Sequence, residues 1–152
     1  MEAQYSPIQI EEKWSKIWAD RELEKPGSED HFSQIIPPPN VTGTLHMGHS
    51  FQYAIMDFYT RYHHMNGTDS HWQVGTDHAG IATQMVVENN LLNEGKSKDD
   101  LGREKFLEEV WKWKDYSEGE ISTQMKRLGI TVEWDKYRFT YDDDFCKGVN
   151  KA

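Results

Sequence analysis

The chain has 152 residues, of which 36% are hydrophobic and 28% charged, and its formal net charge is −9. This length suits one ordinary domain with a core of its own, and the six Trp and seven Tyr argue against disorder. The negative charge excludes a general electrostatic attraction to nucleic acid or to an anionic membrane, although a local anion site needs only a few oriented donors.

A single cysteine, Cys146, and the distribution of apolar residues indicate the cellular compartment. One thiol cannot form an intramolecular disulfide and offers no cysteine cluster for zinc, which fits a reducing cytosol. No run of about 18 apolar residues is present, and the first residues lack the apolar core of a signal peptide. We therefore expect a cytoplasmic protein that does not contact a membrane.

The first predicted elements are a helix, a loop and a strand. Residues 7–22 carry apolar side chains at helical spacing, and Ser6 followed by Pro7 is a common helix start. Residues 23–30 are polar and turn-rich, as in a loop. Residues 31–36 predict a strand that ends where three prolines begin, because proline donates no ladder hydrogen bond.

A second helix and a second strand follow the prolines. One stripe at helical spacing holds four large side chains, Phe51, Ile55, Phe58 and Tyr62. Asn66 and Gly67 end this helix, since glycine adopts the left-handed conformation of a helix cap. Residues 70–74 predict a short strand. Strand, glycine-containing loop, helix and strand form a βαβ unit, which predicts parallel strands and a right-handed crossover.

The second half of the chain is predicted to be mainly helical. Residues 75–80 form a loop after the second strand, and residues 81–95 predict a helix. The amphipathic pattern of residues 99–128 predicts a long helix, with an interruption near Gly119. The acidic cluster at residues 142–144 can start a last helix, since carboxylates are favourable at a helix N-terminus, but we expect no helix of useful length to follow it before residue 152.

The stretch PPPNVTGTLHMGH, residues 37–49, has the residue types of a phosphate site. The second predicted helix begins inside it, and a helix N-terminus presents N–H groups and partial positive charge to an anion. His46 and His49 lie on one side of its first turn, and Gly48 allows a flat base or a phosphate close to the backbone. Two further neutral donors are Asn40 and Thr44.

This arrangement fits phosphoryl or nucleotidyl transfer, which depends on charge stabilisation at phosphate oxygens more than on a protein nucleophile. Pro37 to Pro39 stiffen the approach to the site and reduce the entropy lost on binding. Asp77, in the loop after the second strand, is expected at the same edge of the sheet. A carboxylate beside a phosphate needs a positive partner, either an ammonium group or Mg²⁺. A zinc site remains an alternative, with Asp77 and His78 as additional ligands.

Four segments of the chain resemble the class I aminoacyl-tRNA synthetases, and within that class the valyl-tRNA synthetase branch. LHMGH resembles the HIGH signature, and PPPNVTGTLHMGH followed by WQVGTDHAGIATQ is similar to the valine branch. The same holds for GREKFLEEVWKWK and for MKRLGITVEWD followed by RFT. The resemblance extends from near Tyr5 to near Asp144.

The resemblance implies an α/β fold, namely the first half of a Rossmann-like nucleotide-binding fold with an N-terminal helix and a long amphipathic helix. Residues 1–30 would form an N-terminal helical segment, and residues 31–152 a partial catalytic domain for ATP and an amino acid. The implied reaction joins valine to ATP, accompanied by Mg²⁺, giving valyl-adenylate and pyrophosphate. Valine is then esterified to tRNA(Val).

The resemblance also implies a role for each site residue. His46 and His49 would be the catalytic pair, contacting the ATP phosphates and stabilising the transition state. The residues implied in ATP binding are these two histidines with Pro39, Asn40, Thr44 and Gly48. The residues implied in valine binding are Pro37 and Pro38, which line a pocket for the branched side chain, Asn40, and Asp77, which takes the ammonium. No residue is implied as a metal ligand.

Several parts of such an enzyme have no counterpart in the 152 residues. These parts are the lysine-containing KMSKS-type signature, the inserted editing domain, the anticodon-binding helices and a basic surface for tRNA. We therefore expect a truncated product with impaired adenylate formation and no efficient tRNA charging. The alternatives are an inactive remnant that binds ATP or adenylate, and a His/Asp metal-dependent hydrolase.

Overall fold

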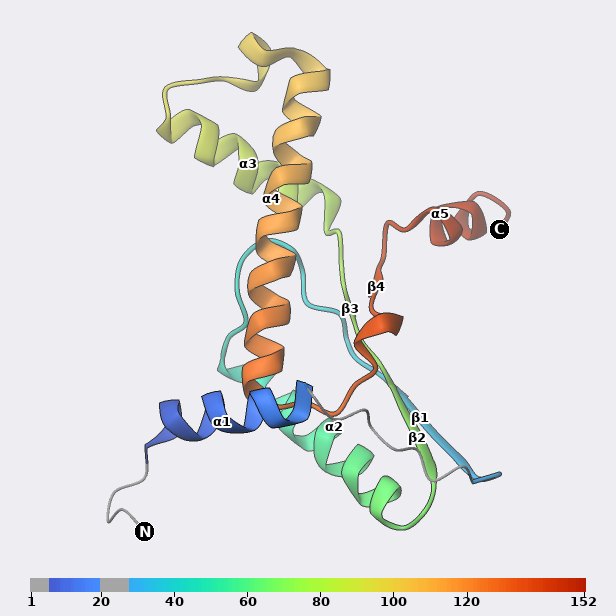
Figure 1. Ribbon diagram of the computed structural model, residues 1–152. Coiled ribbons are helices and arrows are strands. Elements are labelled where there is room, and N and C mark those ends of the chain that lie inside the picture. Colours follow the sequence, from blue (N-terminus) through green and yellow to red (C-terminus); the bar gives the residue numbers. More distant parts are fainter. Residues whose placement is uncertain (1–5, 20–27) are drawn as a thin grey trace. The chain divides into compact units, whose positions relative to one another are not determined.

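The computed structural model of the protein describes residues 6–19 and 28–152 (Figure 1). Its elements in chain order are α1 (Pro7–Ala19), β1 (His31–Ile35), α2 (Met47–Met65), β2 (Asp69–Gln73), β3 (Gly75–Thr76), α3 (Gly80–Asn93), α4 (Lys98–Leu128), a turn of 3-10 helix (Trp134–Lys136), β4 (Arg138–Phe139) and α5 (Asp143–Val149). The chain divides into two compact units. Unit 1 comprises the described residues up to Ile36 with residues 46–74 and 122–136, and unit 2 comprises residues 37–45, 75–121 and 137–152.

α1 confirms the N-terminal helix within the described residues. It begins at Pro7, the position where proline is tolerated because its missing N–H has no intrahelical partner. The predicted last turn of this helix and the first part of the polar loop fall in residues 20–27, outside the described residues. The boundary between an N-terminal segment 1–30 and a domain 31–152 stays a prediction.

Unit 1 is built on the predicted βαβ unit, which the structure confirms. β1 and β2 pair in parallel, with His31 opposite Asp69 and Ile35 opposite Gln73, and α2 connects them. Gly67 follows α2 with a φ of 82°, the left-handed conformation expected at the end of this helix. Helical spacing, together with the prolines and turn residues that bound the strands, therefore located these three elements.

α2 packs against the two strands through a mixed set of side chains. Tyr53 and Thr60 are 0% and 2% exposed, and Tyr53 meets Trp72 of β2 edge-on, with ring centroids 6.3 Å apart. Gln34 of β1 donates from Nε2 to the backbone oxygen of Met56 at 2.7 Å and to the Thr60 hydroxyl. The interface between helix and strands thus includes a hydrogen-bonded amide beside the aromatic contact.

The apolar stripe predicted on α2 remains exposed. Its members are Phe51 at 69%, Ile55 at 43%, Phe58 at 65% and Tyr62 at 55% exposure. The strands of unit 1 cover the side of α2 that carries Tyr53 and Thr60 instead. Helical spacing shows that one face is apolar, but it does not show which neighbour covers that face.

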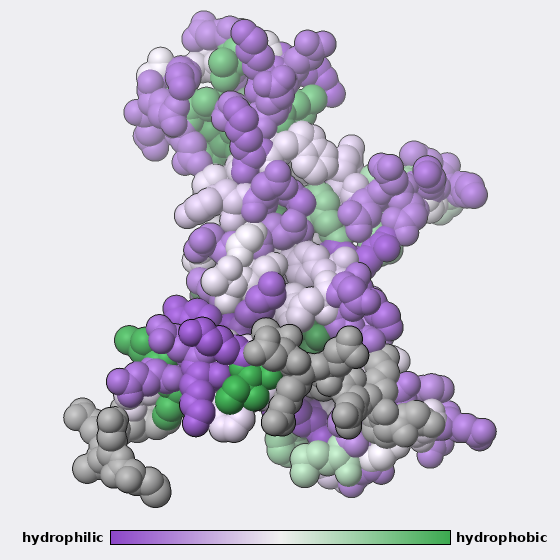
Figure 2. All heavy atoms as spheres, in the orientation of Figure 1, coloured by the Kyte–Doolittle hydropathy of each residue, from purple (hydrophilic) through white to green (hydrophobic). Residues whose placement is uncertain are grey.

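α1 also keeps large apolar side chains exposed. Ile8 is 64%, Trp14 42% and Trp18 44% exposed. On the face drawn in Figure 2, the strongest hydrophobic colour lies over α1. Unit 1 therefore presents apolar side chains on two of its helices.

Asp57 and Arg61 form an ion pair on α2, with 2.6 Å between Asp57 Oδ2 and Arg61 Nε, and both bind the turn that follows α4. Asp57 Oδ1 accepts from the backbone N–H of Thr131 at 2.6 Å, and Arg61 Nη2 donates to the backbone oxygen of Gly129 at 2.6 Å. The Arg61 guanidinium also lies 5.3 Å from the ring centroid of Trp18. Gly129 has a φ of 70°, and a Cβ there would lie 2.3 Å from the Trp18 ring. This turn therefore joins α1, α2 and the end of α4.

Unit 2 has its own apolar core between α3 and α4. The buried residues are Val87, Leu91 and Phe106, with Leu101, Val110 and Trp113 packed against them. β3 and β4 pair in parallel, with Gly75 opposite Arg138. A Cβ at Gly75 would lie 2.1 Å from the Arg138 backbone oxygen, so this close pairing requires glycine. The loop predicted at residues 75–80 therefore begins with a short strand.

The helices of the second half are confirmed, with one correction. The interruption predicted near Gly119 is wrong, because the non-helical residue inside α4 is Gly102, with φ 73° and ψ 167°. Glycine adopts this conformation at little steric cost, whereas Gly119 simply continues the helix. α5 begins directly after Asp142, at the predicted acidic cluster, and its seven residues are more helix than the sequence led us to expect there. Among the described residues, no helix is both long and apolar enough to cross a membrane.

Replacing Gly129 by alanine should destabilise the protein more than the same change at Gly67. Both glycines have a positive φ, so each alanine variant loses about 1 kcal/mol through backbone strain. Only at Gly129 does the new methyl group collide with Trp18, whereas nothing lies within 4 Å at Gly67. We expect a total loss of about 3 kcal/mol for Gly129→Ala in urea unfolding. Equal losses for the two variants would contradict the packing of α1 on this turn.

Candidate functional site

Two histidines cap the N-terminus of α2 in unit 1. His46 is the N-cap residue, and its Nδ1 accepts from the backbone N–H of Gly48 at 3.1 Å. His49 Nδ1 accepts in return from the backbone N–H of His46 at 3.2 Å. This reciprocal pair is a capping box, with imidazoles in the place of the usual hydroxyl and carboxylate side chains. The two rings stack with centroids 3.9 Å apart.

The cap determines where each neutral ring carries its proton. Because Nδ1 of both His46 and His49 accepts from the backbone, the proton must sit on Nε2. Burial, and then the neighbouring His46, lower the pKa of His49 below its ordinary value of 6.5. His49 is therefore neutral at physiological pH. The start of α2 thus carries two stacked imidazoles, each with one Nε2–H donor left over from the cap.

Gly48 fits tightly under this pair. A Cβ at this position would lie 2.9 Å from Cε1 and 3.0 Å from Nδ1 of His46. A side chain at position 48 would therefore press on the imidazole that caps the helix, whereas glycine leaves the ring in place.

The proline-rich segment of the predicted site belongs to unit 2, where it runs beside Asp77. Asp77 N–H donates to the backbone oxygen of Pro39 at 2.8 Å, and Val41 N–H donates to the backbone oxygen of Asp77 at 3.0 Å. These bonds form a parallel bridge between Asn40 and Asp77. Two residues predicted to bind valine, 37 positions apart in the sequence, are therefore neighbours. Pro39 is buried, whereas Pro37, Pro38, Asn40 and Thr44 are exposed.

Two side chains of α4 hold the same segment by its carbonyl groups. Trp113 Nε1 donates to the backbone oxygen of Val41 at 2.9 Å, and Ser117 Oγ donates to that of Gly43 at 2.8 Å. Ser117 is 1% exposed. Neither residue was predicted as part of the site. The only signal in the sequence was their position on the apolar face of the long helix, which does not distinguish packing from hydrogen bonding.

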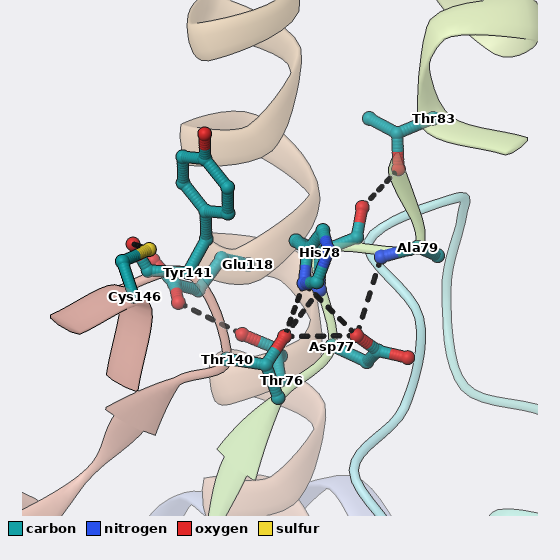
Figure 3. A network of polar contacts seen from close by, with 9 residues as sticks. All are labelled: Thr76, Asp77, His78, Ala79, Thr83, Glu118, Thr140, Tyr141 and Cys146. Carbon is teal, nitrogen blue, oxygen red and sulfur yellow. Dashed lines mark hydrogen bonds and ion pairs between the residues drawn. The ribbon is translucent and has the colours of Figure 1, made fainter. Parts of the chain in front are cut away.

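The Asp77 side chain lies in a network of polar contacts (Figure 3). Its Oδ1 accepts from the Thr140 hydroxyl at 2.8 Å and from the backbone N–H of Ala79 at 3.3 Å, and it lies 3.3 Å from His78 Nδ1. Ala79 has a φ of 41°, the one positive φ of a non-glycine residue within the described ranges. Such strain is maintained only where the surroundings enforce it, as at functional turns. Asp77 itself is 36% exposed.

The described residues hold no group of three or more His, Cys, Asp or Glu side chains arranged to bind a metal ion. His46 and His49 use one nitrogen each on the helix backbone. Asp77 and His78 are engaged with Thr140. No contact of these residues favours the metal-dependent hydrolase that the sequence left open.

Comparison with known proteins identifies the family. The model of the family described as tRNA synthetases class I (I, L, M and V) matches residues 9–152. The chain therefore belongs to the class I tRNA synthetases, as the HIGH-like segment predicted. The match covers both units, including the histidine cap of α2 and the loop of Asp77.

Two relatives carry the name valine–tRNA ligase. The protein of Acinetobacter baylyi is 53% identical over 149 residues, which cover 97% of this chain and 15% of the relative. The protein of Aquifex aeolicus is 49% identical over 152 residues, which cover 98% of this chain and 13% of the relative. The predicted placement on the valine branch is thereby confirmed. The chain spans about one seventh of the length of these relatives.

A solved structure supports the fold. The crystal structure of LeuRS from Agrobacterium radiobacter, in a ternary complex with tRNA and LeuAMS, superimposes with a TM-score of 0.69. The match covers 93% of this chain and 17% of that chain, at 20% sequence identity. The predicted α/β fold of the class I synthetase type, with parallel strands, is therefore confirmed.

Replacing His46 by alanine should raise the pKa of His49 toward 6.5. The change removes both a neighbouring imidazole and part of the burial that disfavour the protonated ring. NMR titration of the imidazole nitrogens measures this shift, with His64→Ala on the same helix as the control. A His49 pKa that stays unchanged or falls in His46→Ala would contradict the coupling.

The same lowered pKa makes folding sensitive to acid. Because folded His49 binds its proton less firmly than the unfolded chain does, its contribution to the free energy of unfolding is fully present above pH 6.5 and is lost as the pH falls through the lowered pKa. His46→Ala should reduce this loss, which urea unfolding across the same pH range measures.

Proposed function

We propose that this chain binds valine and ATP and contributes to the formation of valyl-adenylate and pyrophosphate, as the N-terminal part of a valyl-tRNA synthetase. The observation that carries the proposal is the histidine cap of α2, which supplies two Nε2–H donors at a helix N-terminus. The two valine–tRNA ligase relatives support the choice of amino acid. The cytoplasm is the proposed location.

The reaction needs little covalent chemistry from the protein. A carboxylate oxygen of valine attacks the α-phosphorus of ATP, and the bond from that phosphorus to the oxygen bridging to the β-phosphate breaks, releasing pyrophosphate. The α-phosphate oxygens need the most charge stabilisation in the transition state, where the bond to the valine oxygen is partly formed and the bond to the leaving oxygen is partly broken. We assign His46 and His49 to donate hydrogen bonds to these oxygens. His49, whose lowered pKa keeps its ring neutral, does this through its Nε2–H.

The remaining nucleotide contacts are proposed for the segment before the cap and for Gly48. Pro39, Asn40 and Thr44 are assigned to ATP, and Gly48 is placed under the adenine ring. The absence of a side chain at Gly48 supports this placement of a flat base. Mg²⁺ accompanies ATP and supplies charge neutralisation on the phosphate oxygens when it is bound. No residue of this chain is assigned to it.

The valine contacts are proposed for unit 2. Asp77 takes the α-ammonium, with Asn40 as a second polar contact. Pro37 and Pro38 line the pocket for the branched side chain. The parallel bridge supports this group of residues, because it fixes Asn40 beside Asp77 through backbone hydrogen bonds alone. Under this proposal, the surface formed by Pro37 and Pro38 has to distinguish valine from amino acids whose apolar side chains differ slightly in size.

tRNA(Val) is the partner proposed for the longer enzyme and not for the residues of this chain. One specific observation favours a second candidate, an inactive remnant that binds ATP or adenylate. The chain spans only 15% and 13% of the two relatives, so most of their length has no counterpart among these residues. The two candidates differ in one measurable property, namely catalysis of adenylate formation.

Valine-dependent exchange of pyrophosphate into ATP tests the proposal. Wild-type exchange should require valine, and His46→Ala or His49→Ala should each lower it about 100-fold, a typical effect of losing one transition-state donor. His64→Ala, near the other end of α2, should leave the rate unchanged. An exchange rate that stays at the wild-type level in His46→Ala and in His49→Ala would contradict the assignment of these histidines to the phosphate. No exchange, with binding of a valyl-adenylate analogue intact, would favour the remnant.

Replacing Asp77 by asparagine should weaken valine binding selectively. Asparagine keeps an oxygen acceptor for the Thr140 hydroxyl and the Ala79 N–H, but it loses the negative charge that pairs with an ammonium. We expect the KM for valine in the exchange assay to rise at least about 30-fold, with the KM for ATP unchanged. Parallel rises in both constants would place the carboxylate outside the amino-acid site.

A further inference from the structure

We propose that Thr140 is a positioning residue for the Asp77 carboxylate, turning one oxygen inward to the protein and leaving the other for the α-ammonium of an amino acid. The inference rests on the proposed function, which assigns Asp77 to that ammonium. Thr140 follows β4 and lies 63 positions beyond Asp77 in the sequence. Nothing in the local sequence around either residue indicates that they meet.

The Thr140 hydroxyl is the centre of three contacts in unit 2 (Figure 3). Its Oγ1 lies 2.8 Å from Asp77 Oδ1, 2.9 Å from the backbone nitrogen of His78 and 2.6 Å from His78 Nδ1. The backbone N–H of His78 can only donate. Oγ1 therefore accepts at least one hydrogen bond from the Asp77 loop.

The single hydroxyl proton fixes the rest of the network. Asp77 Oδ1 has no proton when ionised, so at 2.8 Å the Thr140 hydroxyl must donate to it. His78 Nδ1 must then be the protonated nitrogen of its ring and donate to Oγ1. In this arrangement the hydroxyl donates one hydrogen bond and accepts two, which is its full capacity. If the hydroxyl donated to His78 Nδ1 instead, Thr140 Oγ1 and Asp77 Oδ1 would face each other at 2.8 Å as two acceptors without a proton between them.

Within the part of the chain that the structure describes, the contacts of the Asp77 carboxylate fall on one oxygen. Oδ1 accepts from Thr140 and from the Ala79 N–H, and it lies close to His78 Nδ1. With Oδ1 held by these groups, rotation about χ2 is restricted and Oδ2 is presented to a ligand. A carboxylate fixed in advance loses less conformational freedom when it binds an ammonium group.

The backbone holds Thr140 itself in place. Its N–H donates to the backbone oxygen of Thr76 at 3.1 Å, directly after the parallel pairing of β3 with β4. Asp142 Oδ2 accepts from the Phe139 N–H at 3.1 Å and closes the turn on the other side. The pairing of β3 with β4 therefore fixes the backbone from which the Thr140 hydroxyl projects.

Paired ligands separate a positioning role from a structural one. One ligand is valyl-sulfamoyl-adenosine, and the other is its isovaleryl counterpart, which lacks only the α-ammonium. In calorimetric titration of the full chain, Thr140→Val should bind the valyl compound about tenfold more weakly and the isovaleryl compound equally well. Thr140→Ser keeps the hydroxyl and should match the wild type. Thr123→Val, an exposed position on α4, is the control for the isosteric change.

The outcomes separate this inference from the function on which it rests. Equal weakening of both ligands, or no weakening, in Thr140→Val overturns the positioning role. Wild-type chain that binds both ligands equally overturns the ammonium assignment of Asp77 in the proposed function. If neither ligand binds, the ¹³C shift of the Asp77 carboxyl in the free chain still decides the role of Thr140. It should change in Thr140→Val and not in Thr140→Ser, and an unchanged shift in both variants overturns the inference.

Discussion

The start of α2 depends on the fact that an imidazole has two nitrogens on different sides of its ring. The first N–H groups of a helix need acceptors from outside the helix, and His46 and His49 supply them with Nδ1. The nitrogen that remains on each ring is then a donor whose position is set by the helix itself. Aspartate could cap this helix equally well, but an ionised carboxylate would leave no donor for a phosphate.

Local features of the chain were predictable because they depend on short-range physics. Helical spacing located α2, the glycine after it ended it, and the prolines ended β1. The pair His46 and His49 could be found because both lie within one helical turn. The position of the break in α4 could not be found this way, because both Gly102 and Gly119 permit a positive φ and only the surrounding structure selects one.

Contacts between distant segments were not predictable from one sequence. Asp77 was identified by its loop and its charge, but Thr140 approaches it only through the pairing of β3 with β4, two strands of two residues each. Strands this short have no detectable periodicity. Trp113 and Ser117 were similarly hidden, since a helix stripe predicts burial and not the carbonyl group that each side chain meets.

The exposed stripe of α2 affects how the protein will behave in routine assays. Phe51 and Phe58 are 69% and 65% exposed, so a folded molecule offers an apolar surface to dyes that fluoresce in such surroundings. Dye fluorescence is commonly interpreted as a sign of a loosened, molten state. For this chain a high initial signal is expected from the native fold, and melting is better followed by circular dichroism of its helices.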